Sequence, residues 1–252
     1  MSEAAQIDKN ILKDRIILVT GASRGIGRAV ALACAQHGAT VILHGRDEAK
    51  LNDVYDQIED AGLPQPALAP LDLKTADQMA CDHLANVIGE EFGKLDGVVH
   101  NAAILGTMSP IELYETNIWH EVIQVNVNSV FMLTKSLMPL LKASNDGRIL
   151  LTSSGVGRIG RAYWGAYAVS KFAIEGLTQV LAGEIDEYGM AAIAVNPGAT
   201  RTTMRASAFP GENPATLPTP EAIAPAYVYL LGPDGQKYNG QSLDARRLVG
   251  LS

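Results

Sequence analysis

The sequence predicts an α/β domain with a doubly wound, mainly parallel sheet of about seven strands and helices on both faces. Short apolar runs rich in β-branched residues alternate with helix-like segments along the chain, which is the pattern of successive βαβ units. These runs are continuously apolar, as expected for strands buried on both faces of a parallel sheet. No linker, repeat or low-complexity stretch interrupts residues 1–252, so we expect a single domain.

The first half of the chain predicts four strands with three helices between them. Each expected strand is a short apolar run, and each helix shows apolar residues at helical spacing. Gly38 ends the first helix, and Asp47 is placed to cap the second. The expected strands cover residues 15–20, 40–44, 67–73 and 95–100. The expected helices cover residues 24–37, 47–61 and 75–92.

The second half continues the alternation after a loop that contains Gly106 and Pro110. A long helix with Pro139 near its end precedes the fifth strand. The expected helices cover residues 117–142, 166–188 and 220–231. The expected strands cover residues 148–153, 191–195 and 239–244. Residues 198–218 are rich in Thr, Ala and Pro, so we expect a substrate loop there that could close over a site.

Composition and charge exclude several classes of function. The chain is 47% hydrophobic and 19% charged, which is ordinary for a globular protein. Its net charge of −7 argues against nucleic acid as the main partner, because phosphate binding needs a basic face. No apolar run is long enough to span a membrane, and the first residues do not read as a signal peptide. The cysteines and histidines show no metal-binding spacing, so we expect a cytoplasmic protein without a metal or a membrane partner.

A glycine-rich turn joins the first strand to the first helix, where residues 20–27 read Thr-Gly-Ala-Ser-Arg-Gly-Ile-Gly. Glycines let a backbone approach a ligand closely, and a helix N-terminus supplies free N–H groups that suit a pyrophosphate. The spacing differs from the standard dinucleotide fingerprint and lacks the end of a P-loop, so a plain strand–helix turn remains an alternative. Its place in the first βα unit favours a dinucleotide and a Rossmann-type sheet. The candidate contacts are Gly21, Ser23, Arg24, Gly25, Ile26 and Gly27.

The end of the second strand predicts which nicotinamide cofactor is used. An NAD enzyme needs a carboxylate there for the ribose hydroxyls, whereas a 2′-phosphate needs arginine. The chain reads His44-Gly45-Arg46, with no acid until Asp47, and Arg24 lies in the glycine turn. We therefore expect NADP(H) to be preferred over NAD(H), the alternative being that both arginines are only solvated surface residues.

Tyr167 and Lys171 form a Tyr-x-x-x-Lys pair in a predicted helix. Side chains four residues apart share one helix face, so the ammonium is expected to lower the pKa of the phenol. Ser154 follows the fifth strand, where its hydroxyl could hold a substrate oxygen. Alone, such a pair is more often a surface contact. On the same sheet edge as the glycine turn, the three residues predict a proton-transfer site.

Together these motifs resemble the short-chain dehydrogenase/reductase family over residues 16–244. The resemblance also rests on four further motifs of the chain: Asp72-Leu73, His100-Asn-Ala-Ala103, Val125-Asn-Val-Asn-Ser129 and Asn196-Pro-Gly198. The stretches 155–161 and 200–210 are similar to the YciK-like bacterial branch of that family. The family commonly has Asn-Asn-Ala-Gly after the fourth strand, so Ala103 adds a methyl group near the cofactor.

The resemblance implies an enzyme that interconverts a carbonyl and a secondary alcohol by hydride transfer. Tyr167 is the implied general acid or base, Lys171 lowers its pKa and bonds the nicotinamide ribose, Ser154 orients the substrate oxygen, and Asn126 holds a water in a proton relay. Further implied cofactor contacts are Asp72, Leu73, Asn101, Ala102, Ala103, Pro197, Gly198, Thr200 and Thr202. The implied partners are a small carbonyl or alcohol substrate and further copies of the chain, in a homodimer or homotetramer.

Alternatives remain open for two loop residues and for the activity. Arg158 and Arg161 lie between Ser154 and Tyr167, where they could bind an acidic substrate or pair with carboxylates. A non-catalytic NADP(H)-binding or sensing protein would show the same glycine turn. A methyltransferase on a related sheet would also show it, but would leave the Tyr/Lys pair unexplained.

Overall fold

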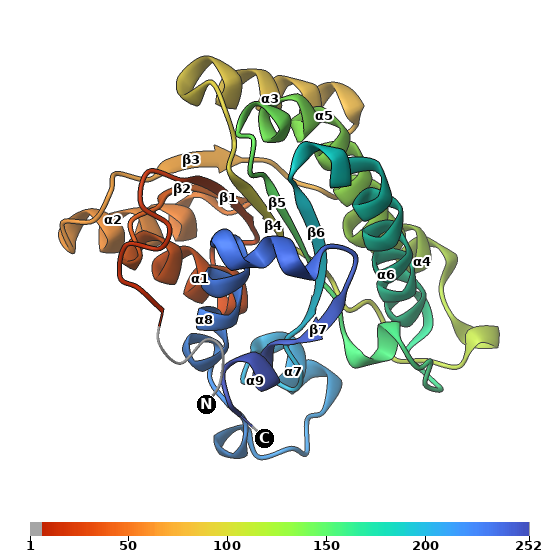
Figure 1. Ribbon diagram of the computed structural model, residues 1–252. Coiled ribbons are helices and arrows are strands. Elements are labelled where there is room, and N and C mark those ends of the chain that lie inside the picture. Colours follow the sequence, from red (N-terminus) through yellow and green to blue (C-terminus); the bar gives the residue numbers. More distant parts are fainter. Residues whose placement is uncertain (1–6, 252) are drawn as a thin grey trace.

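Seven parallel strands form one continuous sheet between two layers of helices (Figure 1). The computed structural model describes residues 7–251, and within them the strand order is β3-β2-β1-β4-β5-β6-β7. The strands are β1 Ile16–Thr20, β2 Thr40–Gly45, β3 Ala67–Pro70, β4 Gly97–His100, β5 Arg148–Thr152, β6 Ala191–Asn196 and β7 Ser242–Asp244. Every neighbouring pair is parallel. The predicted fold class is confirmed.

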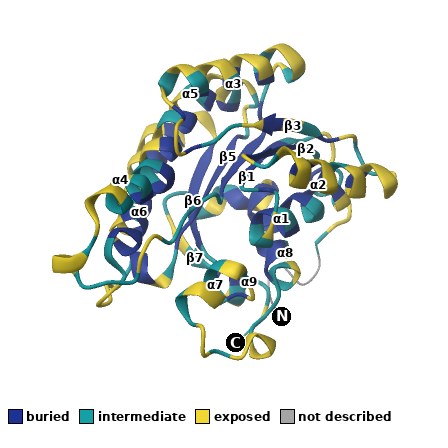
Figure 2. Ribbon diagram, turned by 180° about the vertical axis from the view of Figure 1, so that it is seen from behind, coloured by how far each residue is buried: buried dark blue, intermediate teal, exposed yellow. Residues whose placement is uncertain are grey.

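Two hydrophobic cores fill the space on either side of the sheet. One lies against α1, α2 and α8, and the other against α3, α5 and α6, so the strands are buried on both faces (Figure 2). The helices are α1 Gly25–Gln36, α2 Glu48–Asp60, α3 Gln78–Phe92, α4 Thr116–Ile123, α5 Ser129–Ala143, α6 Gly165–Ile185, α7 Thr203–Ala208, α8 Pro220–Leu231 and α9 Ala245–Leu248. None of the helices within residues 7–251 is long and apolar enough to cross a bilayer.

Local hydrogen bonds explain where the elements depart from the prediction. Helix α3 begins after Asp77 rather than at Thr75, because the Asp77 carboxylate accepts a hydrogen bond from the backbone N–H of Ala80 at 2.9 Å. The third strand ends at Pro70, three residues early. The long helix expected over 117–142 is divided between α4 and α5 by a π-helical turn, Gln124–Asn128.

The expected loop at 198–218 contains regular structure. Thr202 caps the short helix α7 by accepting a hydrogen bond from the N–H of Arg205 at 3.1 Å. A 3-10 turn, Pro214–Thr216, follows it. The sequence did not predict these short helical turns, because a Thr cap inside a Thr-rich stretch is hard to separate from ordinary loop composition. The role of this segment as a substrate loop stays a prediction.

Two buried histidines stand near the carboxyl ends of β2 and β4. His44 and His100 are almost fully buried, and burial lowers the pKa of His44 to about 4 and that of His100 to about 3. The Nε2 atom of His100 lies 2.9 Å from the hydroxyl of Thr134. Both rings are therefore neutral in the folded protein near pH 7.

The buried histidines predict a loss of stability in acid. Below pH 6.5 the unfolded chain binds protons at both histidines and the folded chain does not. The free energy of unfolding should therefore fall as the pH drops from 6.5 toward 4 and below. At pH 5 the expected loss is about 2 kcal/mol per histidine. Urea unfolding of wild type and His100→Asn at pH 7 and pH 5 checks this. Between pH 7 and pH 5 we expect the variant to lose about half as much free energy of unfolding as wild type. Equal losses in the two proteins would mean that His100 is not held neutral by burial.

Candidate active site

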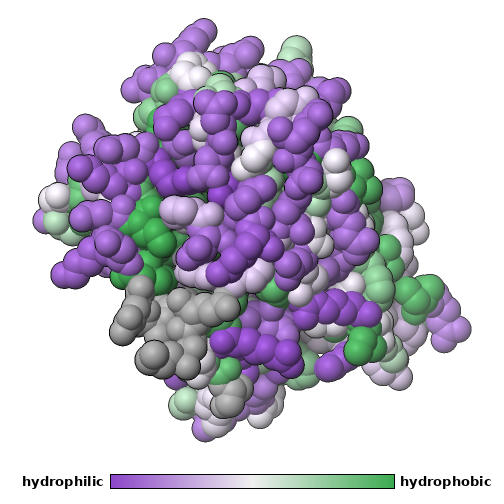
Figure 3. Space-filling view, viewed as in Figure 1, coloured by the Kyte–Doolittle hydropathy of each residue, from purple (hydrophilic) through white to green (hydrophobic). Residues whose placement is uncertain are grey.

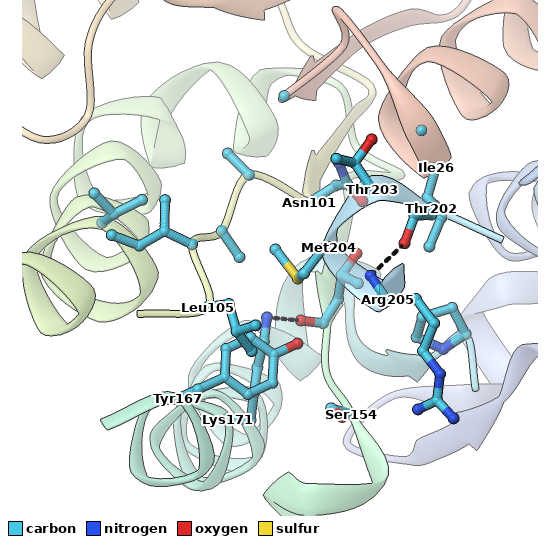
Figure 4. A pocket seen from close by; sticks show the side chains of 18 of the residues that line it. Ile26, Asn101, Leu105, Ser154, Tyr167, Lys171, Thr202, Thr203, Met204 and Arg205 are labelled. Carbon is cyan, nitrogen blue, oxygen red and sulfur yellow. Dashed lines mark hydrogen bonds between the residues drawn. The ribbon is translucent and has the colours of Figure 1, made fainter. Parts of the chain in front are cut away.

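A cavity of about 550 Å³ runs along the carboxyl ends of the strands, across the point where the chain order reverses between β1 and β4. This is the place where open α/β sheets bind their ligands. The predicted catalytic and cofactor residues all line this cavity, except Gly27 and Asn126. Figure 4 shows Tyr167, Lys171 and Leu105 on one side of the cavity, and Ile26, Thr202 and Thr203 on the other.

The glycine-rich turn is shaped for a ligand group that approaches the backbone. Gly21 and Gly25 have φ angles of 68° and 55°, which other residues rarely adopt. A Cβ atom on Gly27 would lie 2.2 Å from the carbonyl oxygen of Gly21, so only glycine lets the helix approach the strand. No side chain caps α1, and its first N–H groups are available to an anion. The turn therefore has the close backbone approach and the free N–H groups that a pyrophosphate would need.

Two arginines mark the end of the cavity near β2. Arg24 and Arg46 line it and are exposed, and neither forms an ion pair within the described part of the chain. The end of β2 is Gly45, so it carries no carboxylate side chain. The acidic residues that line the cavity are Asp72 and Glu121. Glu121 is paired with Lys74 at 2.9 Å. This end therefore has two cations free for a phosphate.

The loop after β4 is fastened to the loop after β1. The hydroxyl of Thr20 accepts hydrogen bonds from the backbone N–H groups of Asn101 and Ala102, at 2.9 and 3.0 Å. The side-chain amide of Asn101 donates to the Thr20 carbonyl at 3.2 Å. These contacts hold the backbone of both loops at the cavity wall, where Ala103 also stands.

Tyr167, Lys171 and Ser154 meet at the other end of the cavity. Tyr167 and Lys171 are buried side chains of α6, one turn apart, and Ser154 follows β5. Lys171 Nζ donates to the backbone carbonyl of Thr152 at 2.7 Å and lies 5.6 Å from the centre of the Tyr167 ring. Figure 4 shows both side chains directed into the same space. The sequence prediction of a shared helix face is confirmed.

The expected lowering of the phenol pKa is not found in this structure. Burial raises the pKa of Tyr167 to about 12, against the opposing effect of a hydrogen bond with Ser154. Burial also lowers the pKa of Lys171 to about 8, while the Glu175 carboxylate works in the opposite direction. Removal from water outweighs the charge of Lys171, whose ammonium bonds Thr152 rather than the phenol. The phenol is consequently protonated at neutral pH, the form that can donate a proton.

Asn126 lies outside the cavity and has a different set of contacts from the one the resemblance implies. Its side chain is buried in the π-helical turn. Its oxygen accepts from the Ile104 N–H at 2.9 Å, and its nitrogen donates to the Ile104 carbonyl at 2.9 Å and to Ser170 Oγ at 3.0 Å. Both N–H groups of the amide and one acceptor position of its oxygen are bound to protein groups, so the side chain anchors the loop after β4. The water relay that the resemblance implies stays a prediction.

Apolar side chains surround the phenol. Val156, Leu105, Trp164 and Met204 pack around Tyr167. The Trp164 ring centre lies 5.8 Å from that of Tyr167 and 5.9 Å from that of Phe209. The sequence did not predict Leu105 or Val156 at the site, because an isolated apolar residue in a loop carries no signal of its own.

The fold and this site define a short-chain dehydrogenase, and the chain belongs to that family. The family model for short chain dehydrogenases matches residues 15–213. The chain is 50% identical to the YciK oxidoreductase of Escherichia coli strain K12 over 249 residues, 98% of each chain. This confirms the predicted branch.

Solved structures agree with this assignment. A short-chain dehydrogenase from Pseudomonas syringae has a TM-score of 0.94 and 53% identity, and the match covers 96% of this chain and 98% of that one. A short-chain dehydrogenase from Shigella flexneri 2a strain 301, complexed with NADP, has a TM-score of 0.92 and 50% identity, and the match covers 95% of this chain and 100% of that one.

Proposed function

We propose that the protein is an NADP(H)-dependent oxidoreductase that interconverts a carbonyl and a secondary alcohol, with Tyr167 as the general acid or base. The observation that carries this proposal is the meeting of Tyr167, Lys171 and Ser154 with an uncapped glycine-rich turn in a single cavity. The NADP complex of the Shigella relative supports the choice of cofactor.

The residues that line the cavity divide into two groups by what they would hold. The N–H groups at the start of α1 would hold the pyrophosphate, and Arg24 and Arg46 would hold the 2′-phosphate that distinguishes NADP from NAD. Bound NADP(H) supplies or accepts the hydride. The remaining cofactor contacts are Asp72, Leu73, Asn101, Ala102, Ala103, Pro197, Gly198, Thr200 and Thr202.

The catalytic residues handle the proton. Ser154 and Tyr167 hold the substrate oxygen between their hydroxyls, and the raised pKa of Tyr167 keeps its proton available for a carbonyl that is being reduced. The Lys171 ammonium, one helical turn away, stabilises the phenolate left after transfer. In the direction of alcohol oxidation the same phenolate would take the proton back.

An NADP(H)-binding protein without turnover is the second candidate, and an assay separates the two. A panel of aldehydes, ketones and secondary alcohols is followed by nicotinamide absorbance, with NADPH binding measured on the same samples. We expect turnover of at least one class of compound. Tight NADPH binding without turnover of any panel member would favour the sensing protein instead.

We also propose that the protein assembles as a homodimer or homotetramer through α5 and α6. Their outward faces carry large apolar side chains that are between 46% and 56% exposed: Phe131, Val169, Phe172 and Val180. Figure 3 shows hydrophobic side chains on the side of the molecule where α4 and α6 lie. Several large apolar side chains exposed on two helices that cover the same face of the sheet favour a protein interface there.

Light scattering tests the assembly. We expect wild type to have the mass of at least two copies, and Phe172→Glu to lower that mass because the charge would be buried without a partner. Glu187→Gln, at the exposed end of the α6 region, serves as the control. A monomeric wild type would contradict the proposal.

A further inference from the structure

We propose that the substrate has a flat apolar body and an anionic group, and that Arg161 binds the anion at the rim of the catalytic cavity. This inference rests on the proposed function, because it concerns the substrate of the same site. It depends on three observations: the aromatic and aliphatic lining beside Tyr167, the state of the three arginines around it, and the way the loop of Arg161 is held.

The lining beside the phenol suits a planar apolar group. Trp164 stands between the rings of Tyr167 and Phe209, tilted at 46° and 47° to them. Leu105, Val156 and Met204 complete the apolar surface. Aromatic walls of this kind bind flat rings by stacking and by burial of apolar area. A small hydrophilic carbonyl compound would leave this surface without a partner.

Of the two arginines that line this end of the cavity, Arg205 has a charged partner within residues 7–251 and Arg161 has none. Arg158 is bound to Asp244 at 2.7 Å and lies 3.5 Å from Glu175. Arg205 makes two hydrogen bonds to Glu212, at 2.6 and 2.7 Å. Arg161 lines the cavity and is exposed, with no hydrogen bond or ion pair from its side chain to another described residue. The sequence left open whether Arg158 binds an acidic substrate or pairs with carboxylates, and in the structure it pairs with carboxylates.

The local charge favours an anion. Asp72 and Glu121 are the acidic residues that line the cavity. Asp72 lies in the loop after β3, and Glu121 is paired with Lys74 of the same loop. No acid lines the cavity beside Trp164 within the described residues. In a chain with a net charge of −7, an unneutralised guanidinium at a cavity rim attracts a carboxylate or phosphate selectively.

The loop that carries Arg161 is held in place. Tyr163 has a φ angle of 73° and Gly165 one of 40°, and a non-glycine residue in this region costs energy that the surroundings must offset. The Tyr163 carbonyl accepts a hydrogen bond from the Ser109 N–H at 3.1 Å. A Cβ on Gly165 would lie 2.2 Å from the Tyr114 ring. The backbone that presents Arg161 and Trp164 is therefore locked against the loop after β4.

Calorimetric titration of the NADP-loaded protein tests the inference without turnover. The probes are three aromatic carboxylates, benzoate, 2-naphthoate and 4-phenylbenzoate, each with its neutral amide. We expect at least one carboxylate to bind about fivefold more tightly than its amide, as for an ion pair of about 1 kcal/mol. Arg161→Gln should remove the difference and leave amide binding unchanged. Arg247→Gln, a matched control at an exposed arginine that does not line the cavity, should preserve it.

Kinetics give the second readout. For the ketone 4-acetylbenzoate, Arg161→Gln should raise KM about fivefold with little change in kcat, and for the methyl ester of that ketone neither constant should change. Two results would overturn the inference: no carboxylate preference in wild type, or a carboxylate preference that survives Arg161→Gln. Carboxylate binding through Arg161 without turnover of any ketone or secondary alcohol would instead contradict the proposed function and leave the anion site standing.

Discussion

Replacing Tyr167 by Phe should lower kcat for an accepted carbonyl by about a thousandfold, because the ring stays in its apolar surroundings while the proton donor is lost. Proton transfer by a positioned side chain contributes between about a hundredfold and ten thousandfold. The Phe ring preserves the packing against Val156 and Trp164. NADPH affinity, measured by fluorescence titration, should therefore stay within about twofold of wild type.

A matched control is available in the loop before α6. Tyr163 is an exposed tyrosine that does not line the cavity, and Tyr163→Phe should keep kcat near the wild-type value. If Tyr167→Phe retained turnover comparable to Tyr163→Phe, another group would have to supply the proton and the assignment of the acid would be wrong.

Replacing Arg24 and Arg46 by Ala should weaken NADPH binding by about tenfold each, and by up to about a hundredfold together, while NADH binding stays unchanged. A hydrogen bond to a charged group contributes about 1.5–3 kcal/mol, and about 1.4 kcal/mol is a factor of ten in affinity. Because both side chains are exposed and form no ion pair within residues 7–251, removing them breaks no other contact among these residues. Fluorescence titration with both cofactors measures the change.

Arg28 is the control for general charge effects on cofactor binding. It belongs to the same helix as the glycine turn, but its guanidinium bonds Gln57 and it does not line the cavity. Arg28→Ala should leave the ratio of NADPH to NADH affinity at the wild-type value. An unchanged ratio in the Arg24/Arg46 double variant would mean that neither arginine reads the 2′-phosphate.

Much of the fold could be predicted because the signals are local. Continuous apolar runs indicate buried parallel strands, and ligands bind at the carboxyl ends of such strands, so Gly21, Ser154 and Tyr167 are expected at one edge from the sequence alone. Asp47 is recognisable as a cap from its position, and its carboxylate does accept from Lys50 N–H.

The remainder depends on tertiary contacts that no local pattern encodes. Arg148 begins the fifth expected strand, and nothing in the sequence indicates its burial. In the structure it is 1% exposed, bound to Asp146 and hydrogen-bonded to the carbonyls of Gly189 and Pro233. The pKa of Tyr167 is shifted opposite to the prediction because burial, which spacing does not reveal, outweighs the nearby ammonium. Arg158 and Arg161 look alike in the sequence, and only the folded position of Asp244 separates them.

Transfer of deuterium from NADPH labelled at nicotinamide C4 tests the central claim most directly. With an accepted ketone and the cofactor labelled on one face at a time, mass spectrometry of the alcohol should show one deuterium on the carbinol carbon for one face only, because the protein holds cofactor and substrate in a single orientation. Product that carries no deuterium from either face, or NADPH binding with no alcohol formed from any ketone of the panel, would contradict the account.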